Sequence, residues 1–531
     1  MASFIVAGRR IWASCVGIVL FGYVAGVPCL ADDVETMSQR IDELLDAKLS
    51  ELGWRAASPA SDAEFLRRVQ LDLTGTPPTA SQVLEFIENE DEAKDAKLIE
   101  RLLTSPLAAS HLGDQWAEWM LPENDGNPFI QADRGLHNWL RDRFSENLRY
   151  DRLVSDLLVA NGPAQAGPAG FFVALEGKPE KLAAKTARVF MGIQLDCAEC
   201  HDHPFDEWSQ KDFWGFAAYF AQVSTGGNPA MMRASSITDT DEGDVVLPGT
   251  DEVIPPKPLV ETGLSGFDSG TRRQNMTLWL TAKENPFLAR ATVNRVWALL
   301  FGQGLIEPID DMRSLEMASH PKLLAELSEY FADSGYDLRQ LIQTIARTKA
   351  YRRSSTHPSG QPPEFSYAAM LAKPLSERQM RNTVRVVARQ IAGDNQQAAD
   401  VLVQQLGRLR GAGSEAKLGI VSALVMLHGD VFDQVSRENS SRLLMALDAP
   451  YMDERKQVRW MFLSTLNRVP TQAEDAAFSD LFASFERSQS ADDDARDDSD
   501  EGETRAKQMQ ATWQSDLLWA LMNSTEFAMT P

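Results

Sequence analysis

Cysteine is scarce in this chain, and that scarcity narrows the roles open to each one. The 531 residues contain four cysteines, and Cys15 and Cys29 lie in an N-terminal segment with the features of a removable export signal. The other two, Cys197 and Cys200, are three positions apart. A framework of several disulfide bonds is therefore excluded, and this pair must serve a local purpose: a cofactor or metal motif, or one short disulfide loop.

Basic residues are also too few to balance the acidic ones. The 52 Lys and Arg residues against 76 Asp and Glu residues give a formal net charge of −24. Such a charge repels phosphate backbones, so we expect no nucleic-acid partner and no anionic membrane surface. The chain has no hydrolase nucleophile elbow, P-loop or dinucleotide-binding turn, and its sequence leaves open whether the protein is an enzyme.

Long apolar runs are missing everywhere except at the N-terminus. There, Arg9 and Arg10 precede an uncharged apolar stretch at 11–27, and small residues follow up to Ala31. We expect a signal peptide at 1–31, with export to the periplasm or the cell exterior and an uncleaved anchor as the alternative. No integral membrane span is expected once this signal is removed.

The rest of the chain has helical periodicity, which predicts a mainly α protein. Residues 225–272 are rich in Gly, Pro, Ser, Thr and Asp and predict a linker with one small β-hairpin near 244–247. We therefore expect two helical domains, at 35–224 and 273–530. Within the second domain, residues 488–504 hold eight acidic residues and one arginine, which predicts a disordered acidic insertion.

Helix caps place several of the expected helices. Ser61 and Thr79 each begin a capping box, and Asn285 followed by proline begins a helix over 286–301. The stretches 71–79 and 463–471 resemble one another, and each leads into a capped helix start. We interpret this internal similarity as two similar helix–turn–helix units.

Residues 197–201 read Cys-Ala-Glu-Cys-His, the C-x-x-C-H pattern that attaches c-type haem. On one helical turn the two thiols and the imidazole share a face, so one segment can hold both the porphyrin edge and the iron. We expect covalent haem c with thioether bonds to Cys197 and Cys200 and with His201 as the proximal ligand. The protein would then be a haem-binding or electron-transfer protein with a redox partner.

Two other roles for the cysteine pair remain open. The pair could close a local disulfide, or it could bind zinc together with His201 and His203. Four tetrahedral ligands within seven residues would be crowded, so a remote histidine such as His111 or His137 is a more plausible zinc ligand. The protein would then be a secreted non-haem enzyme or binding protein that acts on extracellular polymers such as polysaccharide.

Aromatic residues are dense directly after the motif, at Phe205, Trp208, Phe213, Trp214, Phe216, Tyr219 and Phe220. This run fits either the wall of a haem pocket or an ordinary aromatic core. Met231 and Met232 follow it and are the candidates for a sixth haem ligand.

The helix expected at 286–301 has a polar side, and an acidic loop follows it. The residues are Arg290, Asn294 and Arg295 on the helix, and Glu307, Asp310 and Asp311 in the loop. We expect Arg–carboxylate pairs that join the helix to the loop.

Longer stretches around these motifs resemble a known family. Residues 195–208 are similar to the hallmark of a planctomycete secreted family, the second type of planctomycete cytochrome domain, and residues 67–79 are similar to its opening. Residues 285–297, 302–308 and 334–338 resemble the companion planctomycete-specific domain. The resemblance implies these two domains in this order and export from the cytoplasm. The family's name implies a cytochrome, on the strength of the same C-x-x-C-H pattern.

Overall fold

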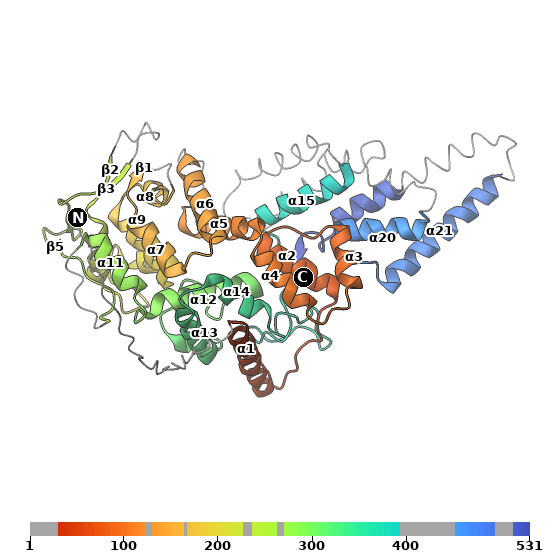
Figure 1. The fold of residues 1–531 in the computed structure, drawn as a ribbon, viewed down its shortest axis with the longest axis horizontal. Helices are drawn as coiled ribbons and strands as arrows, with labels where there is room; N and C mark the ends of the chain where they lie inside the picture. Colours follow the sequence, from red (N-terminus) through yellow and green to blue (C-terminus); the bar gives the residue numbers. More distant parts are fainter. Residues whose placement is uncertain are drawn as a thin grey trace, which may run out of the picture.

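The structure is a computed structural model that describes residues 30–122, 130–163, 167–226, 236–262, 270–392, 452–493 and 513–531. The protein is mainly α, as the periodicity predicts, with only small sheets of two or three strands (Figure 1). Among the described helices, none combines the length and the apolar character needed to cross a membrane. The expected signal peptide, except its last two residues, and the candidate ligands Met231 and Met232 lie outside the described residues.

The first part of the chain forms a run of short helices. They are α1 (Leu30–Leu52), α2 (Asp62–Thr74), α3 (Ala80–Glu88), α4 (Lys94–Leu103), α5 (Pro106–Met120), α6 (Ile130–Ser145), α7 (Tyr150–Leu158), α8 (Ala169–Ala174), α9 (Pro179–Thr186), the π-helix η1 (Ala187–Met191), the 3-10 helix η2 (Leu195–Ala198), α10 (Gln210–Ala217) and the 3-10 helix η3 (Ala218–Phe220). Thr79 forms the predicted capping box of α3 with Gln82, and Gly75 ends α2 at a φ of 63°, a left-handed conformation that glycine adopts without strain.

The later part of the chain is also mostly helical. Its elements are α11 (Arg272–Thr281), α12 (Pro286–Phe301), the 3-10 helix η5 (Leu315–Met317), α13 (Pro321–Asp333), α14 (Leu338–Ala346), α15 (Glu377–Ala392), α20 (Glu454–Thr465) and α21 (Gln472–Asp493). Helix α12 matches its prediction: the Asn285 side chain caps its start and Gly302 ends it at a φ of 77°.

Helix α21 differs from the prediction at its far end. It continues through Asp493, so the first residues of the acidic stretch 488–504 are helical rather than disordered. Helix propagation from the capped start at Thr471, through good helix formers, accounts for this extension. The rest of the acidic stretch lies outside the described residues.

The strands gather mostly in the stretch that the sequence marked as a linker. β3 (Ser236–Asp239) pairs antiparallel with β1 (Gly162–Pro163) on one side and with β2 (Val223–Gly226) on the other. β4 (Val245–Val246) and β5 (Val253–Ile254) form the predicted small hairpin. β6 (Lys373–Pro374) pairs with β7 (Met529–Thr530) near the C-terminus.

This stretch is packed against the helices rather than spanning a gap between them. Ile237 of β3 is fully buried, and the β3 residue Asp239 forms an ion pair of 2.7 Å with the buried Arg273 of α11. The sequence did not predict this three-stranded sheet, because its strands are short and one of them comes from residues 162–163.

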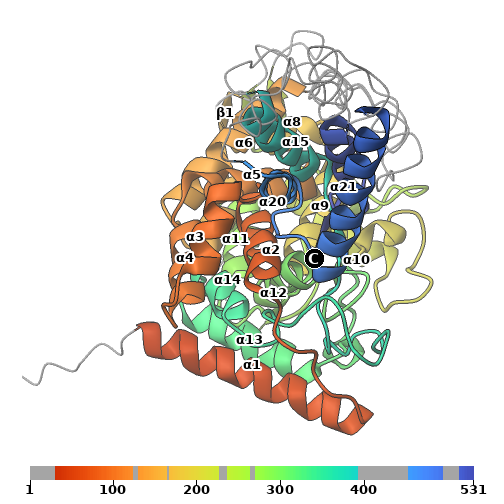
Figure 2. The same ribbon diagram turned by 90° about the vertical axis from the view of Figure 1, so that its right-hand side faces the viewer.

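One hydrophobic core spans both predicted domains. It contains Phe190 next to the cysteine motif, Trp297 of α12 and Leu327 of α13, all fully buried. Helix α1 of the first predicted domain also contacts the second predicted domain directly: its Ser38 hydroxyl donates to the Thr344 carbonyl of α14 at 2.7 Å. Figure 2 shows α1 lying along α13 at one edge of the molecule. The stretch 225–272 therefore separates sequence motifs but not hydrophobic cores.

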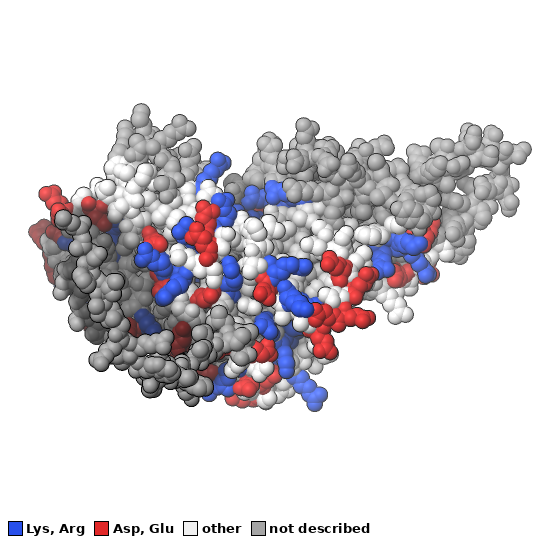
Figure 3. Space-filling model, viewed as in Figure 1, with Lys and Arg blue, Asp and Glu red and all other residues white. Residues whose placement is uncertain are grey.

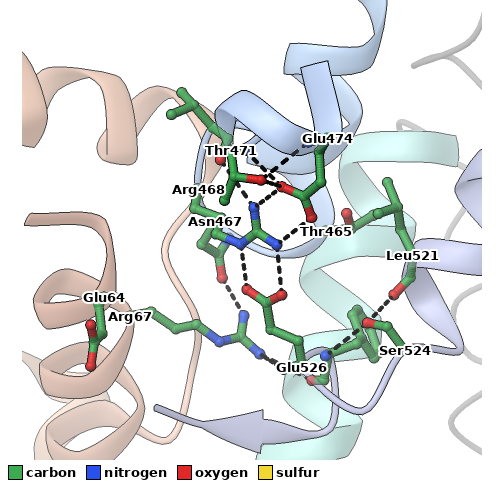
Figure 4. A network of polar contacts seen from close by, with 12 residues as sticks. Glu64, Arg67, Thr465, Asn467, Arg468, Thr471, Glu474, Leu521, Ser524 and Glu526 are labelled. Atoms are coloured by element: carbon green, nitrogen blue, oxygen red, sulfur yellow. Dashed lines mark hydrogen bonds and ion pairs between the residues drawn. The ribbon is translucent and has the colours of Figure 1, made fainter. Parts of the chain in front are cut away.

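A second, smaller core forms around α15 and α20 and includes Leu71 of α2. The two similar helix–turn–helix units meet beside it. Arg67 of α2 donates to the Asn467 side-chain oxygen at 2.5 Å (Figure 4). The Asn467 amide donates to the Pro78 carbonyl at 2.8 Å. Asn467 has a φ of 60° at the position that matches Gly75 in the first unit, so the two turns share their left-handed residue.

Helix α2 carries charges into the interior. Asp72 is 2% exposed, accepts a hydrogen bond from the Tyr351 hydroxyl at 2.8 Å and pairs with the Lys373 ammonium at 2.6 Å. Lys373 also donates to two carbonyls at the C-terminal end of α12. Burial raises the pKa of the Asp72 carboxyl, and Lys373 opposes that rise. Arg68, fully buried, donates to the carbonyls of Tyr351, Arg353 and Pro531.

Replacement of Asp72 by alanine should destabilise the fold strongly. It would leave the Lys373 ammonium buried without its carboxylate, which costs about 3–5 kcal/mol when one partner of a buried pair is removed. The urea midpoint, followed by circular dichroism, should fall accordingly. As a control, Lys97→Ala removes only the exposed pair with Asp91 and should leave the midpoint unchanged. A midpoint for Asp72→Ala equal to that of the control would contradict the prediction.

Candidate functional site

The C-x-x-C-H motif follows an irregular stretch of helix. Helix α9 passes into the π-helix η1, Gly192 takes a left-handed conformation with a φ of 69°, and the 3-10 helix η2 then leads into turns. The expectation of one α-helical turn for the motif is therefore wrong: Cys197 lies in η2, and Cys200 lies in the turn after it.

Both thiols of the motif are accessible. Cys197 and Cys200 are exposed and unbridged in this structure, so the local disulfide is not formed here. Between them, Ala198 is fully buried and anchors the segment to the core. The Glu199 carbonyl accepts hydrogen bonds from Gln210 and from the Trp214 indole, at 3.1 and 3.0 Å, which ties the motif to α10.

The two histidines of the motif differ in their hydrogen bonds. The Nδ1 atom of His201 lies 2.7 Å from the Asp202 carbonyl oxygen, which can only accept, so Nδ1 carries the proton. The Nε2 lone pair of the exposed His201 ring is therefore available to a metal. His203 has the opposite arrangement, since its Nδ1 accepts from the Phe205 amide at 3.2 Å and its neutral ring is protonated at Nε2.

The cysteines and histidines of the motif do not converge on one point. Within the described parts of the chain, no group of three or more His, Cys, Asp or Glu residues is arranged to hold a metal ion. The remote candidates lie elsewhere. His137 of α6 contacts Asp114 of α5 at 3.0 Å, and His111 is buried in α5.

His111 is a core residue. A Cβ atom on Gly75 would lie 2.6 Å from its Nδ1 atom, so the ring fills the space that glycine leaves. Its Nε2 atom is buried without a hydrogen-bond partner in the described residues. Burial lowers the pKa of His111 to about 4, because the charged imidazolium would lose its hydration.

Most of the aromatic run after the motif forms core rather than pocket. Phe213, Phe216 and Phe220 are fully buried. Phe205 is the exception at 80% exposed, four residues beyond His201. A shallow hollow of about 690 Å³ lies over β2 and the end of β3, and no motif residue lines it.

The segment that leads into the motif is held by the second part of the chain. Arg295 of α12 is 5% exposed and donates to the carbonyls of Val189 and Arg188 at 3.2 and 2.7 Å. Its guanidinium also lies over the Trp119 ring. The expected pairing of this arginine with a carboxylate of the following loop is therefore wrong, because backbone carbonyls of η1 take its hydrogen bonds.

The loop after α12 reaches the same segment. Asp310 accepts a hydrogen bond from Gln194 at 2.9 Å and lies 3.6 Å from the Arg188 guanidinium. Arg188 in turn pairs at 2.7 Å with Asp196, the residue before Cys197. Sequence reasoning missed Arg188 and Gln194 because neither belongs to a recognised motif. Asp310 was noted, but its partner lies more than a hundred residues away.

Charges of both signs are mixed over the surface seen in Figure 3, where Lys and Arg lie among Asp and Glu. The net negative charge thus does not form a single acidic field on this face.

Two family models match the chain in the order that the resemblance implied. PSCyt2, a protein of unknown function (DUF1549), matches residues 40–225, and PSD1, a protein of unknown function (DUF1553), matches residues 272–408. The chain belongs to the proteins that carry these two domains in succession. No curated protein and no solved structure matches it. The clamp formed by Arg295 and Asp310 thus joins the PSD1 part to the C-x-x-C-H segment of the PSCyt2 part.

Acid should destabilise the protein through its core histidines. His111 and His320 are buried, and burial lowers each pKa from 6.5 to about 4. The unfolded chain therefore binds more protons between these values, and stability is lost as the pH falls from 6.5 towards 4. Each histidine should account for about 2 kcal/mol of the loss between pH 7 and pH 5.

This loss can be measured by urea unfolding at both pH values. The His111→Gln variant should show a smaller difference between pH 7 and pH 5 than the wild type, whatever its absolute stability, and the double variant with His320→Gln a smaller one still. An undiminished difference in the double variant would assign the acid sensitivity to other groups.

Proposed function

We propose that this protein is exported and carries one covalent haem c, attached through Cys197 and Cys200 with His201 as the axial ligand. The proposal rests on the presentation of the motif: two exposed free thiols followed by an imidazole whose Nε2 lone pair is available. Export fits the proposal because haem is attached to such motifs after translocation.

Each residue of the motif has a distinct task in this proposal. The two sulfurs anchor the group, and the Asp202 carbonyl keeps the proton of His201 on Nδ1, so that Nε2 faces the metal as a neutral ligand. When bound, the haem supplies one-electron transfer or small-ligand binding at its iron. Phe205, exposed beside the motif, offers an apolar surface that a porphyrin could cover.

The arrangement of donors favours haem over zinc. A structural zinc ion needs four ligand atoms at about 2.0–2.3 Å from one point. A c-type haem needs only one protein atom at the iron, while the two sulfurs bond to the porphyrin edge. Donors that are exposed but do not converge therefore suit the second group better. No observation on the described residues favours the alternative of a protein acting on extracellular polysaccharide.

Expression in the periplasm with a haem-attachment system should give a protein with a Soret band and a mass increased by one haem. Because both thioethers depend on the cysteines, Cys197→Ser and Cys200→Ser should each lower the covalent haem yield at least tenfold. His201→Ala should keep some covalent haem but change the visible spectrum, since the iron loses its axial nitrogen.

A known c-type cytochrome matured in the same cells is the positive control, and Glu207→Gln, at an exposed position outside the motif, is the control variant. Apoprotein recovered from cells that mature the control would refute the haem proposal. The same mass spectrum then distinguishes a disulfide, two hydrogens lighter, from a free dithiol, and metal analysis detects zinc.

A further inference from the structure

The approach to the motif has little regular secondary structure of its own to hold it. Between α9 and η2 the chain passes through a π-helix and a left-handed glycine, and three backbone carbonyls of this segment accept hydrogen bonds from outside it. Residues of the PSD1 part donate these hydrogen bonds. Arg295 binds two of them, and the Met312 amide donates to the Gly192 carbonyl at 2.7 Å.

Close packing accompanies these bonds. A Cβ atom on Gly192 would lie 2.9 Å from the Met312 side chain, so the loop and the approach segment touch with no spare room. The approach segment is thus fixed from outside, by residues more than a hundred positions later in the chain.

The loop that makes these contacts is itself fixed by α12. The Asn294 amide nitrogen donates to the Ile306 and Ile309 carbonyls at 2.9 and 3.3 Å, and its oxygen accepts from the Ile306 amide at 3.0 Å. Asn294 is fully buried, so these bonds have no competition from water. The Tyr367 hydroxyl adds a bond to the Gly304 carbonyl at 2.7 Å.

Ion pairs and a hydrogen bond extend from this loop to the residue directly before the motif. Asp310, on the loop, contacts both Gln194 and Arg188, and Arg188 pairs with Asp196 directly before Cys197. Burial lowers the pKa of the Arg295 guanidinium and the Asp310 carboxylate opposes that change, so the two clamp residues also support one another electrostatically.

We propose that Asp310 and Arg295 are positioning residues, through which the PSD1 part holds the segment 187–196 and so fixes how Cys197 and Cys200 are presented. This inference gives the PSD1 part a task at the motif of the other domain. It deepens the proposed function, because a fixed motif matters most for haem attachment, but its first tests use protein without haem. A site presented by such a segment needs a rigid supporting shell to keep its geometry.

The first test is backbone hydrogen exchange in the reduced, haem-free full chain. Asp310→Ala should speed the exchange of peptides covering 187–196 about tenfold, because local opening then breaks fewer contacts. Arg295→Lys should act in the same direction, since a lysine cannot bridge both carbonyls. Asp311→Asn is the matched control: this neighbour on the same loop pairs with Arg313, and its exchange pattern should match the wild type.

The second test is the thiol–disulfide equilibrium of Cys197 and Cys200 against glutathione. The clamp stabilises the dithiol conformation seen here, so Asp310→Ala should favour the disulfide at least threefold, and Asp310→Glu should restore part of the wild-type value. A general loss of stability would not move this equilibrium while the protein stays folded, which circular dichroism verifies.

The outcomes separate this inference from the haem proposal. Faster exchange and a shifted equilibrium in the clamp variants, without haem in any variant, would support the positioning role and refute the haem proposal. Normal exchange and an unchanged equilibrium in Asp310→Ala would overturn the positioning role, even if the wild type carries haem. If Asp310→Ala fails to fold, the milder Asp310→Asn, which keeps an acceptor for Gln194 but loses the charge, takes its place.

Discussion

The buried ion pair between Asp72 and Lys373 is the constraint on which the rest of the structure depends. A carboxylate and an ammonium in the interior are tolerated only when each has its partner, so α2 and the strand that carries Lys373 must come together. Lys373 at the same time caps the last carbonyls of α12, and Arg68, one turn earlier on α2, binds carbonyls near residue 352 and at the C-terminus. One helix of the PSCyt2 part thus fixes the PSD1 part and the end of the chain.

The same interlocking explains why the second domain reaches the motif of the first. Because α1, α2 and α12 share one core, the loop after α12 lies against the approach to Cys197 without any linker to cross. Arg295 and Asp310 make use of this proximity. In this arrangement the irregular backbone at 187–196 is supported by side chains from a distant part of the sequence, which is how a strained or irregular segment persists beside a functional site.

Local features were predictable from the sequence where the physics is local. Caps at Thr79 and Asn285, the glycine after α12 and the small hairpin near 245 depend on residues a few positions apart. The partner of Arg295 was predicted wrongly because an arginine on a helix gives no sign of which distant carbonyls it will meet. The three-stranded sheet was missed for the same reason, since β1 and β3 are more than seventy residues apart.

The sequence by itself determined the mainly α class, the order of the two family domains and the presence of a C-x-x-C-H motif, because periodicity, caps and spacing are written in neighbouring residues. Only the tertiary structure decided that both domains share one core and that Arg295 and Asp310 of the PSD1 part bind the segment before Cys197. Those features come from contacts between residues far apart in the chain, and burial, not local propensity, selects them.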